Sequence, residues 1–254
     1  MDHSTHLAMS HDPTLVVISW AVAILAASAA LTTLDLLRST SRHRAAWLLG
    51  GATTFGLGTW AMHFIAMRAM SLGMAVQYDL PITALSVVFS IFGAWLSFNL
   101  ITRGRPNFGR ILVSGTFLGA GIGAMHYTGM AALQTNAALG YNLGLVGASV
   151  GVAVTIASLG LWLMTSRRLQ NVRGRSLIVA AVVGSAIPLM HYAGMAAARF
   201  SAEAGGAPLG LGTSTTTLLN FLLVGSVVVL SFPLFFRGLF QAPGDLSAEL
   251  PKEA

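Results

Sequence analysis

The sequence predicts an all-α membrane protein with seven transmembrane helices that contain a threefold parallel repeat of two-helix units. Three observations support this fold class: an apolar composition, seven long apolar stretches, and one histidine motif that recurs three times. Hydrophobic residues make up 55% of the 254 positions and charged residues only 9%, whereas soluble domains carry about 25% charged residues. A chain so poor in charge lacks the polar surface that a water-soluble domain of this length needs.

The apolar stretches place the helices along the chain. A spanning helix needs about 20 mostly apolar residues. Seven stretches reach that length, at 13–37, 46–67, 81–101, 110–133, 143–165, 176–198 and 215–236. They form a membrane domain at 13–237, between a leader at 1–12 and a tail at 238–254.

The basic residues indicate the orientation of the helices. Of the 14 Lys and Arg residues, 12 flank the helices at one end, and only Arg68 and Arg199 flank them at the other. The positive-inside rule places the basic end in the cytoplasm, with the N-terminus outside and the C-terminus inside. The net charge of +6 therefore reflects topology, so membrane lipid is an expected partner and nucleic acid is not. We expect a multi-pass protein of the inner (cytoplasmic) membrane.

The two termini indicate how such a protein acts. No basic residue precedes the first apolar stretch, so we expect that helix to stay as an anchor and not to be cleaved as a secretory signal. The tail is expected to be too short for an output domain, which implies an unidentified partner protein. The leader contains His3, His6 and His11, and it is interpreted either as a metal-collecting segment or as a solvated tail.

A motif of the form Met-His-aromatic-x-small-Met recurs at 62–67, 125–130 and 190–195. Each copy closes a two-pass unit, so all copies run in the same direction and end at the same depth, near the outer face. There they are placed to form one outward-facing site. The histidines are His63, His126 and His191. The glycines that precede them by seven residues, expected to be helix-packing notches, are Gly56, Gly119 and Gly184.

Each motif combines an imidazole with two thioethers. The methionines four residues after each histidine, on the same helix face, are Met67, Met130 and Met195. The methionines just before each histidine, which suit a second ion, a neighbouring helix or packing, are Met62, Met125 and Met190. Imidazole with thioether favours copper, particularly Cu(I), over hard cations, and three histidines with an open position also suit zinc. The alternative is that the histidines only link helices and the methionines only fill the core.

The residues next to the histidines and the missing residue types refine this hypothesis. Tyr127 and Tyr192 are expected to hydrogen-bond around the ligands and not to bind the ion. An open position on a reduced copper also suits a diatomic gas. The absence of cysteine excludes thiolate ligands and disulfides.

The stretches Met125-His126-Tyr127-Thr128 and Met190-His191-Tyr192-Ala193, with the more divergent Met62-His63-Phe64-Ile65, resemble the MHYT family of integral-membrane sensor domains. The resemblance covers residues 15–236. It implies six or seven spanning helices, with motifs near the outer ends of alternate helices. It also implies copper binding through the motif residues and sensing of O2, CO or NO. Family members are often fused to diguanylate cyclase, phosphodiesterase or histidine kinase domains.

The sequence therefore predicts a membrane sensor or regulator that binds copper at an outward-facing His/Met site and acts through a partner protein. One alternative is a copper carrier or transporter, which needs a second polar station below the motifs. There the helices offer mainly Ser, Thr, Gly, Asn99 and Asp35. Another alternative is a haem protein or metal-bearing enzyme, since two histidines on facing helices can ligate haem. No catalytic motif is present, so enzymatic activity is not expected.

Overall fold

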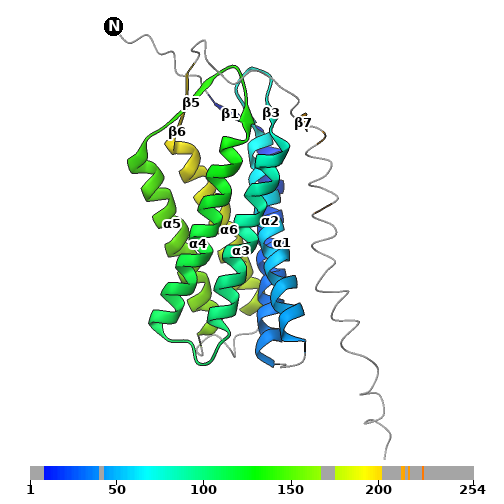
Figure 1. Cartoon of the computed structure of the whole chain (residues 1–254), viewed down its shortest axis with the longest axis vertical. Helices are drawn as coiled ribbons and strands as arrows, with labels where there is room; N and C mark the ends of the chain where they lie inside the picture. Colours follow the sequence, from blue (N-terminus) through cyan, green and yellow to red (C-terminus); the bar gives the residue numbers. More distant parts are fainter. Residues whose placement is uncertain are drawn as a thin grey trace, which may run out of the picture.

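A computed structural model describes residues 9–39, 43–166 and 175–201, with residues 213, 214, 217 and 225. Within these ranges the chain forms six long helices (Figure 1). They are α1 (Pro13–Ser39), α2 (Arg44–Ala69), α3 (Leu80–Ile101), α4 (Phe108–Ala131), α5 (Leu143–Thr165) and α6 (Arg175–Ala197). Each begins and ends within two residues of its predicted bounds. The tail and nearly all of the leader and the predicted seventh helix lie outside the described residues.

The helices have the surface of a membrane protein. Five of them, α1, α3, α4, α5 and α6, are long and apolar enough to cross a bilayer. Large hydrophobic side chains such as Phe92, Phe108, Leu143 and Leu177 are exposed on these helices, which suits lipid and would promote aggregation in water. The remaining helix, α2, falls short in hydropathy because it carries Gly, Thr and His. It tolerates them because 18 of its 26 residues are buried against protein.

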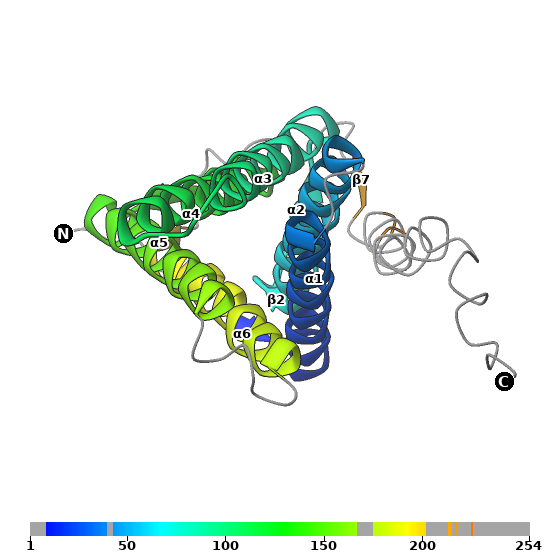
Figure 2. The same ribbon diagram turned by 90° about the horizontal axis from the view of Figure 1, so that it is seen from below.

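The six helices form a closed ring. Each helix packs against its neighbours in sequence, and α6 packs against α1. Viewed along the bundle, the pairs α1/α2, α3/α4 and α5/α6 make the three sides of a triangle (Figure 2). This arrangement agrees with the predicted threefold repeat of two-helix units.

Short antiparallel strands frame each helix pair at one end of the bundle, which we call the strand end (Figure 1). The strand before each pair hydrogen-bonds to the strand after it. The pairs are β1 (Ser10–His11) with β2 (Met70–Ser71), β3 (Gln77–Tyr78) with β4 (Leu133–Gln134), and β5 (Ala138–Tyr141) with β6 (Ala198–Ser201). A further strand, β7 (Thr213–Ser214), joins β3. The repeat unit is therefore strand–helix–helix–strand.

A second repeated feature sets the register between the two helices of each pair. The first helix of each pair begins at a side-chain cap, Asp12, Asp79 or Asn142, whose oxygen accepts a hydrogen bond from a backbone N–H in the first turn. Such caps satisfy donors that a helix start leaves unpaired. The backbone N–H of each cap donates at 2.9 Å to the carbonyl of an alanine six residues after a motif histidine, namely Ala69, Ala132 and Ala197. Each cap thus ties the start of one helix to the end of the histidine-bearing helix in the same pair, at the same position in all three repeats.

The glycines seven residues before the histidines are packing notches, as predicted. A Cβ atom on Gly56 would lie 2.7 Å from the backbone nitrogen of Ile91 on α3, and one on Gly119 would lie 2.6 Å from that of Val154 on α5. Gly184 meets the backbone of Ile24 on α1 in the same way. The third notch is therefore filled by α1, which closes the ring.

Replacing Gly119 by alanine is expected to destabilise the bundle, because the added methyl group meets backbone atoms that cannot move aside. Overpacking of this kind costs about 1–3 kcal/mol. Thermal unfolding in detergent measures the loss. The matched control is Gly147→Ala on the exposed face of α5, where an added Cβ has no atom within 4 Å. Equal melting temperatures for the two variants would contradict the notch.

Candidate metal centre

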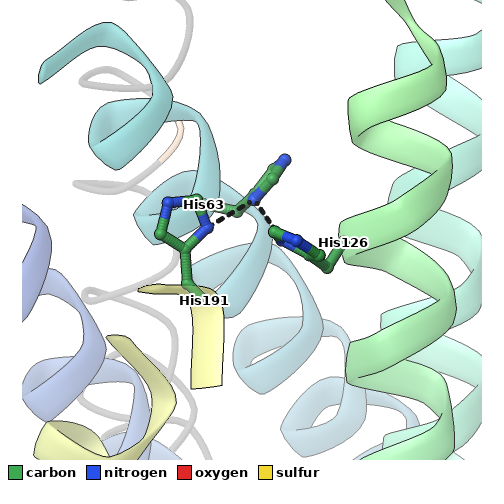
Figure 3. A group of neighbouring side chains, drawn as sticks. All are labelled: His63, His126 and His191. Carbon is green, nitrogen blue, oxygen red and sulfur yellow. Dashed lines mark hydrogen bonds between the residues drawn. The ribbon is translucent and has the colours of Figure 1, made fainter. Parts of the chain in front are cut away.

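Three buried histidines converge inside the ring near its strand end. His63 projects from α2, His126 from α4 and His191 from α6 (Figure 3). Each side chain is at most 1% exposed. The Nδ1 atom of His63 lies 3.0 Å from Nδ1 of His191 and 3.2 Å from Nδ1 of His126. The ring centroids are 4.9, 5.0 and 5.1 Å apart and the rings are steeply inclined to one another, so the cluster keeps the threefold pattern of the helices.

The described residues do not satisfy the hydrogen-bonding capacity of these rings. A neutral imidazole has one N–H and one acceptor nitrogen, so Nδ1 of His63 cannot bond well to two other Nδ1 atoms at once. The Nε2 atoms of His63 and His126 are buried and have no hydrogen-bond partner within the described residues. Unpaired polar atoms are costly inside a protein, and in native structures they call for a specific explanation.

A metal ion satisfies this arrangement. Imidazole nitrogens bind zinc-sized ions at about 2.0–2.1 Å, which places three ligands about 3.3–3.6 Å from one another. The observed Nδ1 separations are close to that value. One ring nitrogen from each of the three histidines lies within 4.8 Å of the other two. Within the described part of the chain, no carboxylate joins the cluster.

Glycines form seats for two of the imidazoles. A Cβ atom on Gly129 of α4 would lie 2.6 Å from Nε2 of His63, and one on Gly194 of α6 would meet Nε2 of His126. These glycines occupy the small position three residues after the motif histidine. The same position in the first motif is Ala66. The sequence shows that this position stays small, but only the structure shows that it receives a ring from the neighbouring repeat.

The six motif methionines are all buried and lie in distinct layers. Met67, Met130 and Met195 belong to an apolar cluster at the strand end, which also contains Phe64 and Tyr78. Met62 and Met190 belong to the cluster that fills the rest of the bundle, and Met125 is fully buried. The histidines therefore lie between layers that contain thioethers. Ligation by these methionines stays a prediction.

The first of the tyrosines that follow the histidines has a different role from the one expected. The Tyr127 hydroxyl is 2.6 Å from Oγ of Ser149 on α5. Tyr192 lies near Ser19 on α1, but its hydroxyl makes no close hydrogen bond within the described residues. The Tyr127 prediction is therefore wrong: its hydroxyl bonds to the next helix pair and not to a ligand histidine. In the first motif, which has Phe64 here, Nε1 of Trp60 donates to Oγ of Ser86 on α3 at 2.9 Å.

The serines in these contacts repeat like the histidines. Ser19, Ser86 and Ser149 are buried, and each donates to the carbonyl three residues before it. Each follows its helix cap by seven residues. The contacts of these serines fasten the three repeats to one another around the site.

Nearby, at the strand end, burial and the adjacent Tyr127 raise the pKa of Tyr141 to about 12, so the hydroxyl of Tyr141 stays protonated.

Part of the histidine-bearing leader lies beside the centre. His11 in β1 is exposed, packs edge-on against Tyr192 with ring centroids 5.7 Å apart, and interacts electrostatically with His191. His3 and His6 lie outside the described residues. Neither interpretation of the leader is tested further by the structure.

Three consecutive stretches, 56–114, 119–180 and 184–242, match the MHYT family, described as a bacterial signalling protein N-terminal repeat. The bifunctional diguanylate cyclase/cyclic di-GMP phosphodiesterase MucR of Pseudomonas aeruginosa is 35% identical over 90% of this chain and 34% of its own length. The cyclic di-GMP phosphodiesterase NbdA of the same species is 36% identical over 82% and 27%. The signaling protein YkoW of Bacillus subtilis is 28% identical over 76% and 24%.

The chain thus spans about a third or less of the length of these curated relatives. No solved structure matches it. Each matched stretch begins on one of the notch glycines that precede the motif histidines. The family repeat therefore has the same period as the three convergent histidines. The chain belongs to the MHYT family of membrane signalling domains.

Proposed function

We propose that this protein is a membrane sensor or regulator in which His63, His126 and His191 hold a copper ion. The observation that carries the proposal is the convergence of three buried imidazoles, with Nδ1 atoms 3.0 and 3.2 Å apart. Within the described residues, Nε2 of His63 and Nε2 of His126 have no hydrogen-bond partner. Membership of a signalling family supports the sensory role.

The ligand set favours copper. Three imidazole nitrogens, with no carboxylate beside them in the described part of the chain and with thioethers nearby, suit a soft or borderline ion and disfavour Mg²⁺ or Ca²⁺. Zinc fits the three nitrogens equally well in geometry, and metal analysis distinguishes the two ions. When bound, copper supplies a one-electron redox couple and an open coordination position for a diatomic ligand such as O2, CO or NO.

The protein around the site suits a small apolar ligand. Two cavities, of about 40 and 20 Å³, lie between the helices and are lined almost entirely by apolar side chains. The two share Phe55, Leu118, Ala157 and Val183, and the smaller one reaches Met190, the residue before His191. Apolar cavities stay dry and accept apolar guests. The smaller cavity therefore offers an apolar space beside Met190, the neighbour of His191 in the chain.

We further propose that the strand end lies on the outer side of the inner membrane. The domain is proposed to have seven transmembrane helices. The described arginines support this orientation. Those at the opposite end are Arg44, Arg103, Arg105, Arg110 and Arg175, as the positive-inside rule expects for the cytoplasmic face. Arg68 and Arg199 are at the strand end.

Transport of the ion across the membrane fits the structure less well. Below the histidines, the described interior of the bundle is an apolar cluster that includes Leu34, Phe98 and Ile101. Asp35 is exposed, and Oδ1 of Asn99 accepts from Nε of Arg103, so neither residue forms a polar station in that cluster. A haem would need to insert its macrocycle between facing imidazoles, and the short Nδ1 contacts leave no space for it.

The signal is proposed to pass to another protein or domain. In this proposal the described helices sense the ligand, and any catalytic step takes place elsewhere. The names of two relatives refer to synthesis and breakdown of cyclic di-GMP. An enzyme of cyclic di-GMP turnover is therefore the class of partner that we propose for the output.

Metal analysis of detergent-purified protein tests this function. We expect about one copper ion at the histidines of each wild-type chain and the loss of that ion in His126→Ala, because His126 supplies one of three ligands. The control is His43→Asn. His43 is exposed and has a left-handed backbone, with φ of 58°, which asparagine tolerates. Full copper retention in folded His126→Ala, or a wild type that takes up no copper on reconstitution, would refute the proposal.

A further inference from the structure

A cavity of about 380 Å³ opens at the strand end, between the end of α2 and strand β3. Its lining comes from the segment 67–78. The side chains that matter here are Met67, Arg68, Met70, Met74, Gln77 and Tyr78. We call it the methionine cavity, because three of the 11 methionines in the chain line it.

The donor set of this cavity selects one class of ion. Thioethers are neutral, soft ligands that bind Cu(I) and not hard cations. Among the described residues no carboxylate lines the cavity, and Arg68 is the charged side chain in its lining. A guanidinium repels divalent cations more strongly than monovalent ones, so the surroundings favour a soft monovalent ion held by bonds that do not depend on opposite charge.

Two buried polar atoms in the cavity wall are left without a partner. Oε1 of Gln77 and the hydroxyl of Tyr78 have no hydrogen bond within the described ranges. Burial raises the pKa of Tyr78 above its ordinary value, more than the nearby Arg68 lowers it, so the hydroxyl stays protonated. An oxygen acceptor and a hydroxyl are thus available to a bound ion or to its water.

The methionine cavity is also linked to the histidine centre. Met67 lines the cavity and follows His63 by four residues, on the same face of α2. Met70 and Tyr78 pack in the same apolar cluster as Met67, Met130 and Met195. The histidines themselves are at most 1% exposed, whereas Met74 is half-buried and Arg68 is exposed. An ion that enters through this cavity would therefore meet Met74 before it meets the imidazoles.

We propose that the methionine cavity is a second metal site, which captures Cu(I) at the surface and passes it to the histidine centre. Cu(I) binding in the cavity is inferred only from the residues that line it. Delivery rests on the proposed function of the three histidines.

Silver(I) is a suitable probe, because it is a soft monovalent ion that does not change oxidation state. Titration of the purified chain by calorimetry is expected to give about two Ag(I) per wild-type chain and about one in the Met70→Leu/Met74→Leu variant, because leucine keeps the apolar volume but removes the soft ligands. The matched control is Met164→Leu in α5, a buried methionine away from the cavity, which should keep both ions.

The two proposals fail separately in this experiment. Wild-type Ag(I) stoichiometry and affinity in the double variant would overturn the cavity site. Loss of an ion in the double variant but not in His126→Ala would uphold the cavity and refute the histidine centre. If both hold, the double variant should load Cu(I) into its histidines more slowly than wild type but to the same final occupancy, and an unchanged loading rate would overturn delivery.

Discussion

Replacing His63 by alanine is expected to cause the largest loss of copper affinity of any single motif substitution. His63 is the central ring: its Nδ1 contacts the Nδ1 atoms of both His126 and His191. Its removal leaves two ligands with no short Nδ1 contact between them. We expect the affinity to fall by more than the 10–100-fold typical of residues that only orient a ligand.

Competition with a Cu(I) chelator measures this loss, with His191→Ala compared in the same series. The three histidines are equally buried, so burial alone would predict equal effects. An affinity for His63→Ala equal to or above that of His191→Ala would contradict the central position of His63. Circular dichroism of the variants confirms that the helices remain folded.

The second large effect is expected at a residue that binds no metal. In Gly129→Ala the new methyl group would lie 2.6 Å from Nε2 of His63, so the imidazole must turn away or the helices must separate. Because all three histidines remain, the loss reports their positioning. Copper affinity should fall about 10–100-fold, as it does when residues that hold ligands in place are changed.

The control for this substitution lies on the same helix. A Cβ atom on Gly123 of α4 meets only Cγ2 of Val150, at 3.4 Å, so Gly123→Ala should keep wild-type affinity. The spectrum of bound Cu(II) should also change in Gly129→Ala and not in the control. Wild-type affinity and spectrum in Gly129→Ala would show that the glycine seat does not position His63.

The helices could be predicted from the sequence because the apolar stretches are long and bounded by polar residues. All six described helices match their predicted ranges within two residues at each end. The strands could not be predicted, because pairs as short as Ser10–His11 and Met70–Ser71 are too short to show an alternating pattern. The helix caps and the serines seven residues after them also repeat in the sequence. This second repeat could have predicted the contacts between neighbouring helix pairs.

The candidate site could be predicted in its residues but not in its geometry. The triple motif identified His63, His126 and His191 and implied a common depth, yet the short contacts depend on which helices meet. The divergent first motif gave no sign that His63 would be central. The tyrosine prediction failed because a spacing of one residue places Tyr127 towards the adjacent helix and Ser149, and not towards the neighbouring imidazoles.

X-ray absorption at the copper edge of the reconstituted protein tests the histidine centre most directly. Three imidazoles bound to one ion give a first shell of nitrogens at about 2.0 Å together with the multiple scattering of imidazole rings. We expect that signature, fitted by three imidazoles per copper, in the wild type and its loss in His63→Ala. A first shell of sulfur without imidazole scattering, or a spectrum that is the same in both proteins, would contradict copper ligation by the three histidines.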